Sequence, residues 1–222
     1  MSESLWAQAE IRFRSELPAR YAQAKFDLVA QETPARQRVL RQVRQWMRQA
    51  DWRGLALYGE GFVGKTWLAI ATAAALIADP AVDDVRAGAF TSLRDLGGSV
   101  QSSTARRLMD TSLDDEIGPE DARLSERTVL VIDALAGENW RYPLHPSRER
   151  LNFLMEDRVS HGGRLIFTTS QPPDKVEWYL GDATQIDYLR AAVQWVWMGD
   201  CEDWNARMRR LGSSESTQAT PH

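Results

Sequence analysis

The chain has 222 residues, of which 43% are hydrophobic and 26% charged, and its formal net charge is −4. This composition predicts one globular domain with a sizeable core and excludes a disordered or fibrous protein. The longest apolar stretch, at 67–78, is too short to cross a membrane, and no basic-then-apolar leader opens the chain. Cys201 is the single cysteine, so we expect no internal disulfide and a reducing, cytoplasmic location.

The first segment, 1–16, is expected to be a short helical extension. Leu5, Ala9 and Phe13 recur at helical spacing, and a single amphipathic helix can dock into a groove of a partner. Sixteen residues are too few to form a domain of their own.

The N-terminal part of the chain, from residue 1 to Gly54, is unusually basic. Up to Gly54 the chain carries ten basic and six acidic residues, a local surplus of four positive charges. Arg41, Arg44 and Arg48 fall on one helical face, away from the apolar positions that begin at Val39. This face either contacts phosphates or is the solvated side of an amphipathic helix, and the sequence leaves both readings open.

Residues 59–66 read Gly-Glu-Gly-Phe-Val-Gly-Lys-Thr and fit the phosphate-loop pattern G-x-x-x-x-G-K-[ST]. The glycines allow close backbone approach, Lys65 brings a positive charge to the outer phosphates, and the Thr66 hydroxyl can coordinate Mg²⁺. An apolar strand at 55–58 and a helix at 67–78 provide the expected flanks, and the helix dipole favours an anion at this loop. The expected nucleotide-binding residues are Gly59, Glu60, Gly61, Phe62, Val63, Gly64, Lys65, Thr66 and Trp67.

Beyond the loop, apolar and helix-like segments alternate. We expect strands at 85–93, 128–133, 164–169 and 193–198, a helix-like stretch at 95–109, an acidic loop or short helices at 110–126, and a helix near 148–159. Residues 212–222 resemble a disordered tail. Buried strands alternating with helices predict an α/β protein with three layers, in which helices cover both faces of a parallel sheet of about five strands.

Asp133 ends the strand at 128–133 and is the second part of the predicted site. A carboxylate at the carboxyl end of a strand that neighbours the loop strand can hold Mg²⁺ opposite Thr66. We therefore assign Thr66 and Asp133 as the metal ligands and expect their two strands to be adjacent.

The order of these motifs resembles the AAA+ ATPases of the DnaC and IstB type, which are helicase loaders and transposition helpers. The resemblance covers roughly Leu17 to Trp204. It rests on Leu-Pro-Ala-Arg-Tyr at 17–21, the approach and loop at 53–66, Val-Ile-Asp at 131–133, Thr-Thr-Ser-Gln-Pro-Pro at 168–173 and Leu-Gly-Asp at 180–182. It implies an AAA+ core over 17–211 with little or no C-terminal lid domain.

The resemblance also implies a cofactor and partners. Members of this family bind ATP with Mg²⁺ between subunits and form ATP-dependent rings or filaments. They handle DNA or a DNA-bound partner, here a replicative helicase or a transposase, with single-stranded DNA as the expected form. The candidate catalytic residues are Lys65, Asp133, Gln171 and Arg190.

Several positions depart from the family pattern. Ala134 replaces the acidic residue that orients water, Gln171 replaces the sensor asparagine, and Tyr188 stands where an arginine finger is expected. Asn205 replaces a further arginine. Because an arginine finger contributes about 10³ to 10⁵ in rate, we expect slow hydrolysis at most. The alternative is that Arg190, together with Glu138 or Glu60, performs these roles.

Three functions follow from the resemblance and its departures. The first is a DNA-replication ATPase that recruits or loads a helicase. The second is a transposition helper that forms ATP-dependent assemblies on DNA. The third is a catalytically silent ATP-binding adaptor that acts through protein contacts.

Overall fold

The computed structural model describes residues 2–26, 33–49, 53–79, 88–92, 129–135, 154–155, 163–180 and 183–201. Its helices are α1 (Ser2–Ser15), α2 (Pro34–Arg48), α3 (Lys65–Ala78), α7 (Pro173–Leu180) and α8 (Ala183–Ala192), with a 3-10 turn η1 (Ala19–Tyr21). Its strands are β1 (Gly54–Tyr58), β2 (Gly88–Ser92), β3 (Val129–Asp133), β4 (Arg164–Thr169) and β5 (Val193–Trp197).

The five strands form one parallel sheet in the order β2-β3-β4-β1-β5. The predicted fold class is thereby confirmed. The expectation that the strands of the loop and of Asp133 are neighbours is wrong, because β4 lies between β1 and β3. Parallel strands all end at the same edge, so the loop and Asp133 still meet there, one strand apart.

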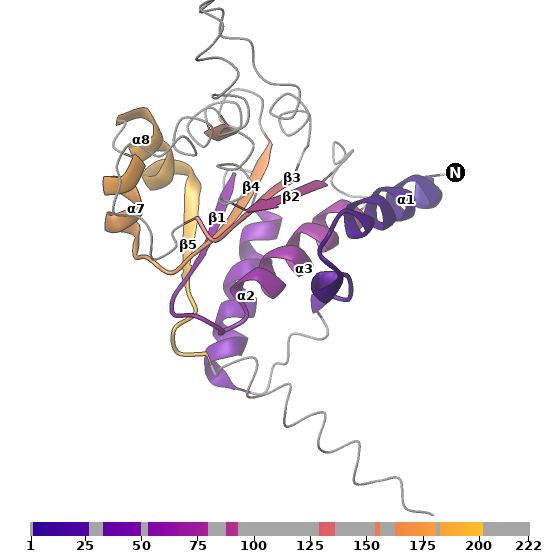
Figure 1. Cartoon of the computed structure of the whole chain (residues 1–222), viewed down its shortest axis with the longest axis horizontal. Helices are drawn as coiled ribbons and strands as arrows, with labels where there is room; N and C mark the ends of the chain where they lie inside the picture. The colour runs from indigo at the N-terminus through magenta and orange to yellow at the C-terminus, as the bar shows by residue number, and fades with distance from the viewer. Residues whose placement is uncertain are drawn as a thin grey trace, which may run out of the picture.

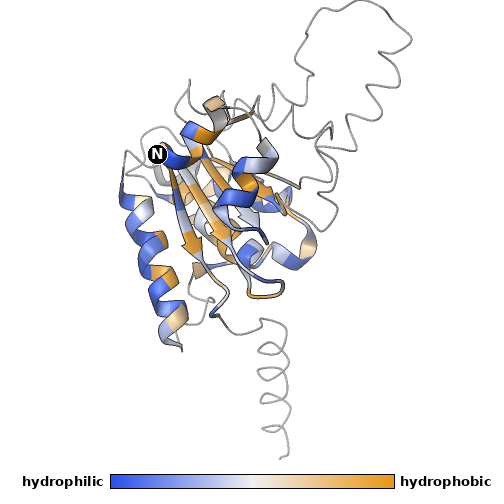
Figure 2. Cartoon of the chain, turned by 90° about the vertical axis from the view of Figure 1, so that its left-hand side faces the viewer, coloured by the Kyte–Doolittle hydropathy of each residue, from blue (hydrophilic) through white to orange (hydrophobic). Residues whose placement is uncertain are grey.

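Helices cover both faces of the sheet, as Figure 1 shows. Alternate strand residues face opposite sides. Leu55 and Leu57 of β1 pack with α1, α2 and α3, whereas Ala56 packs with α7 and α8. In Figure 2 the hydrophobic strands lie between helices whose outer residues are hydrophilic. The protein therefore has three layers with one apolar core on each side of the sheet.

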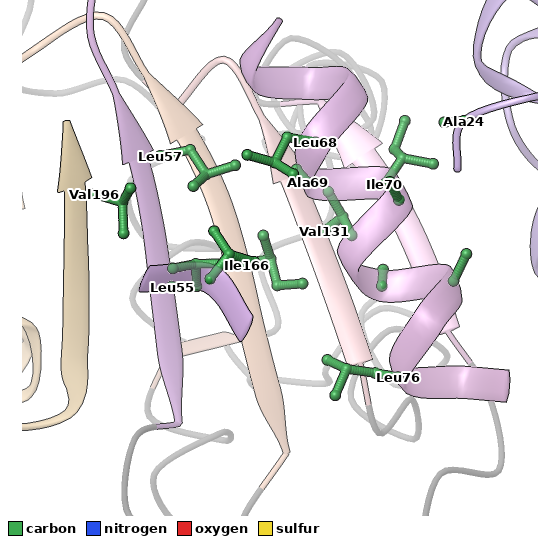
Figure 3. Close-up of a cluster of buried hydrophobic side chains, with 14 of the residues drawn as sticks. Ala24, Leu55, Leu57, Leu68, Ala69, Ile70, Leu76, Val131, Ile166 and Val196 are labelled. Atoms are coloured by element: carbon green, nitrogen blue, oxygen red, sulfur yellow. The ribbon is translucent and has the colours of Figure 1, made fainter. Parts of the chain in front are cut away.

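Helix α3 is the central element of the first core. It is hydrophobic nearly all round, and its side chains Leu68, Ile70 and Leu76 are buried. Figure 3 shows Leu68 and Ala69 beside the strand residues Leu57 and Val131. A helix that is apolar on every side has to be covered on every side, and α1 packs along its outer surface.

Helix α1 belongs to this core. Phe13 is only 1% exposed and packs against α3 and β2, while Ile11 on the opposite side is 67% exposed. The Phe13 face of the predicted N-terminal helix is therefore occupied within the chain rather than open for a partner.

Helix α2 begins with a side-chain cap and lies against β5. The Thr33 hydroxyl accepts a hydrogen bond of 3.3 Å from the Arg36 amide, and Pro34 occupies the first turn. At the other end, the Arg164 guanidinium on β4 donates to the carbonyls of Trp46 and Gln49 at 3.4 and 3.2 Å. These contacts fix the helix on the sheet.

The described residues allow some of the predicted strands and helices to be compared with the structure. Strands β1 to β5 and the helix after the loop lie where they were expected, whereas α7 and α8 were not predicted. The predictions for 95–126, Glu138, Asn205 and the tail 212–222 lie outside the described residues, as does most of the helix at 148–159. Across the residues that are described, no helix combines the length and apolarity needed to cross a membrane.

Candidate nucleotide-binding site

The phosphate loop connects β1 to the first residue of α3. Three of its residues have positive φ: Gly59 at 141°, Phe62 at 64° and Gly64 at 91°. Glycine tolerates this region, but a Phe62 backbone held there costs about 1 kcal/mol. Gly59 is also fixed by close approach, since a Cβ there would lie 2.8 Å from the Gly199 nitrogen. The sequence thus folds into a tight loop whose shape depends on small residues at both ends.

Lys65 extends back over this loop. Its ammonium group donates to the Gly59 carbonyl at 2.8 Å and to the Glu60 carbonyl. Burial lowers the pKa of Lys65 from its ordinary value of 10.5, and the nearby Asp133 carboxylate partly opposes that shift. A half-buried ammonium at the start of a helix is well placed to bind an anion that arrives at the loop.

Asp133 connects the loop to the neighbouring strands. One of its oxygens, Oδ1, accepts a hydrogen bond of 2.7 Å from the Thr66 hydroxyl and another of 2.6 Å from the Thr168 hydroxyl. Thr66 comes from α3, Asp133 from β3 and Thr168 from β4, so three elements meet at one carboxylate. The structure thus brings the two predicted metal ligands together, and their role as ligands stays a prediction.

These residues fit a bound Mg²⁺. Mg²⁺ prefers hard oxygen ligands and is commonly held by one or two protein groups together with the phosphates of the nucleotide. Thr66 and Asp133 would provide those protein ligands. The ion would neutralise charge on the outer phosphates, and the protein residues would orient it.

A cavity of about 440 Å³ opens beside the loop. Phe62, Lys65 and Trp67 line one side, and Arg20 and Tyr21 of η1 line the other. Its size falls within the range of small-molecule sites, and its wall combines aromatic and charged groups.

The η1 side of the cavity is held in place by α1. The Arg14 guanidinium donates to the carbonyls of Ala22 and Ala24 at 3.0 and 2.9 Å and to Glu10 at 2.8 Å. The Arg20 guanidinium lies 4.7 Å from the centre of the Tyr21 ring, close enough for a cation–π interaction. The N-terminal helix thus positions one wall of the cavity.

Ala134 follows Asp133 in an unusual conformation. Its φ is 55°, its amide donates to the Thr168 hydroxyl at 2.9 Å, and the next amide, of Leu135, donates to the Thr168 carbonyl at 2.7 Å. A methyl group cannot accept a proton or align a water molecule. The site therefore holds the metal-side carboxylate firmly but has no acid at this position.

The candidate residues for transition-state roles are more dispersed. Gln171 is half-buried just beyond β4, and its backbone N–H donates a hydrogen bond of 3.0 Å to the Thr169 hydroxyl. Tyr188 is only 7% exposed in the core between α8 and the sheet. Arg190 lies on the exposed side of α8, where Glu177 of α7 binds its guanidinium at 2.8 and 3.0 Å and raises its pKa. In the described chain, the site at the loop unites Lys65, Thr66 and Asp133, whereas Arg190 pairs elsewhere.

Two contributions were missed by sequence reasoning. Thr168 carries a hydroxyl in the apolar run of β4. Its hydrogen bonds to Asp133 and Ala134 depend on β4 lying beside β3, which the sequence did not predict. Arg20 and Tyr21 belong to the Leu-Pro-Ala-Arg-Tyr segment that the resemblance included, so that segment was the available signal for the cavity wall.

The sequence matches no protein-family model and no curated protein. The fold does resemble solved structures. The crystal structure of the DnaC helicase loader has a TM-score of 0.64 and 20% identity, covering 82% of this chain and 99% of that chain. The DnaI crystal structure gives 0.59 and 16%, covering 87% and 99%. The replication initiator DnaA, bound to AMPPCP and single-stranded DNA, gives 0.56 and 11%, covering 92% and 58%.

The loop, the carboxylate and the parallel sheet define a P-loop nucleotide-binding domain. More specifically, its fold matches that of the DnaC helicase loader and of DnaI, so the fold that the resemblance in the sequence predicted is confirmed.

Proposed function

We propose that this protein binds ATP with Mg²⁺ and uses nucleotide occupancy to control a DNA-replication complex, in the manner of a helicase loader. The observation that carries the proposal is the meeting of Lys65, Thr66 and Asp133 at one edge of the sheet. The similarity to DnaC and DnaI over nearly their whole length supports the replication role. A hexameric replicative helicase is the proposed partner, and single-stranded DNA is the proposed nucleic acid.

The proposal includes slow hydrolysis. Ground-state affinity comes from the loop, the lysine and the metal ligands, whereas turnover needs a positioned water and an arginine from a neighbouring subunit. Ala134 provides no carboxylate, and Tyr188 is packed inside the chain, so neither residue can supply these groups. This arrangement favours a switch governed by binding.

The structure supports the two alternative functions, the silent adaptor and the transposition helper, to different degrees. The buried Tyr188 also fits a catalytically silent adaptor, which differs from a loader in its indifference to DNA. No described contact favours the transposition helper specifically.

One preparation can test the proposal. Calorimetry should show ATP binding that tightens with Mg²⁺ and disappears in Lys65→Ala, while phosphate release stays far below one turnover per minute, on the order expected without an arginine finger. Mass measurements with and without ATP test for ATP-dependent homo-oligomers, and co-purification tests for the helicase. Flat calorimetry with the folded protein contradicts nucleotide binding, and rapid turnover lost in Arg190→Ala contradicts the slow-hydrolysis part.

A further inference from the structure

Helix α2 carries five arginines and no acidic residue. Two of the five are used within the protein, since Arg36 is buried and Arg38 forms an ion pair of 2.9 Å with Asp200. The other three, Arg41, Arg44 and Arg48, are exposed at spacings of three and four residues. Such spacing places them on one face of the helix. We call these three residues the arginine stripe.

The opposite face of α2 fixes the direction in which the stripe points. Val39, Val43 and Trp46 are buried in the core. The Gln194 side chain on β5 donates to the Gln42 carbonyl at 3.3 Å, and Arg164 bonds the last turn. Because the inner face is held at several points, the helix cannot rotate the stripe towards the core.

The stripe has no neutralising partner among the residues the structure describes. By contrast, Arg12, Arg38 and Arg190 each have a carboxylate within 4.0 Å. The Arg44 guanidinium lies over the Phe26 ring, 6.0 Å from its centre. Three like charges therefore occupy about 10 Å of helix, since each residue advances 1.5 Å.

The chemistry of this face selects among anionic partners. Three arginines alone would hold an anionic membrane surface only weakly, and the apolar face of α2 that could insert is already buried in the core. A protein interface would need an apolar centre, yet the large exposed hydrophobics of the described chain are Ile11, Phe62, Trp178 and Trp197, none of them on α2. Guanidinium groups match phosphate geometry well.

We propose that the arginine stripe is a docking surface for the phosphate backbone of a nucleic acid. The exposed side chain of Gln45 lies on the same helix and adds a neutral donor for phosphate or sugar oxygens. The contact is independent of base sequence, because phosphates carry no sequence information. This inference rests on the proposed function, because it gives a DNA-handling ATPase a surface that holds the nucleic acid.

The test compares two variants of α2 by fluorescence anisotropy. The probes are a labelled thymidine oligonucleotide and a mixed-sequence duplex of the same length, each titrated at several salt concentrations. Arg41→Gln/Arg44→Gln/Arg48→Gln should weaken binding about tenfold or more near 0.1 M salt and lower the slope of log K against log salt by about 2 to 3. The matched control is Arg38→Gln, whose charge Asp200 already balances. Glutamine has a helix propensity close to that of arginine, so both variants should fold.

The outcomes separate this proposal from the proposed function. Wild-type affinity and slope in the triple variant, or an equal loss in Arg38→Gln, would overturn it, as would stripe-dependent binding of an acidic protein by a chain that binds neither probe. Tighter binding of one probe, lost in the triple variant, supports it and assigns the strand form. ATP affinity measured alongside should not change, so a protein that fails to bind ATP but holds the oligonucleotide through the stripe contradicts only the proposed function.

Discussion

Thr66 and Asp133 lie 67 residues apart in the sequence, and the Thr66 hydroxyl donates a hydrogen bond of 2.7 Å to the Asp133 carboxylate. This contact joins the phosphate loop to β3 across the intervening end of β4. It also brings a hydroxyl and a carboxylate close enough to share one divalent ion.

Asp133→Asn should separate metal binding from nucleotide binding. The amide oxygen can still accept the hydrogen bond from Thr66, but the negative charge that would hold Mg²⁺ is lost. We expect ATP affinity in Mg²⁺ to fall about tenfold or more, to the value seen in EDTA, where variant and wild type should agree. Calorimetry under both conditions measures this, and an unchanged Mg²⁺ dependence would exclude Asp133 as a ligand.

Thr168→Val should weaken the same carboxylate indirectly. Thr168 is 2% exposed, and its hydroxyl bonds both Asp133 and the Ala134 amide, so valine leaves a buried donor unsatisfied. We expect a loss of about 1 to 3 kcal/mol in the free energy of unfolding, together with a weaker Mg²⁺ dependence of ATP binding.

The matched control for that variant is Thr72→Val on α3. The Thr72 hydroxyl is buried and donates to the Leu68 carbonyl one turn earlier, at 2.7 Å, away from Asp133. Chemical denaturation should show a smaller change there, and the Mg²⁺ dependence should stay that of the wild type. If both variants lower the Mg²⁺ dependence equally, the Thr168 effect is one of general stability.

Placing an arginine at the finger position should damage the fold rather than restore hydrolysis. Tyr188 is buried with Val193 and Leu189, so Tyr188→Arg puts an unpaired charge in the core. We expect a loss of more than about 3 kcal/mol in unfolding free energy, and a milder loss in Tyr188→Phe. A stable Tyr188→Arg protein with faster phosphate release would show that residue 188 reaches the nucleotide of a neighbour.

The two faces of α1 should respond differently to truncation. Phe13→Ala removes a ring from the core and should cost about 3 to 5 kcal/mol of unfolding free energy, whereas Ile11→Ala should cost little. Thermal or urea unfolding measures both. Equal effects would mean that α1 does not pack as described, and a large Phe13 effect means that deleting this helix is a poor test of partner binding.

Cys201 should report on opening of the fold. Burial raises the pKa of its thiol above the ordinary value of 9.0. Since the thiolate is the reactive form, a raised pKa leaves less thiolate near pH 8, and burial also blocks access. Alkylation should be slow in the native protein and accelerate in urea, as followed by mass spectrometry. Equal rates in both conditions would place the thiol on the surface.

The phosphate loop could be predicted because its function lies in the residue types themselves. Glycines, a lysine and a hydroxyl at fixed spacing leave few alternative structures. The insertion of β4 between β1 and β3 could not be predicted, since 128–133 and 164–169 are both short apolar runs and nothing local to either specifies its neighbour.

Helix α7 has a signal in the sequence that was not used to predict it. It begins at Pro173, and proline is favoured in the first turn of a helix. The burial of Tyr188 lies beyond sequence reasoning, because a tyrosine on a short helix can face either side. Tertiary contacts with Val193 and the sheet decide its orientation.

The end of β4 touches both halves of the site. Its Thr169 carbonyl receives the Gly59 amide at 3.2 Å, while Thr168 holds the turn that follows Asp133. The same strand continues within a few residues into α7, where Trp178 is exposed to solvent. Residues 170–172 alone separate the end of β4 from the start of α7, so a displacement of the β4 end by a bound nucleotide would be passed to α7 along a short covalent path.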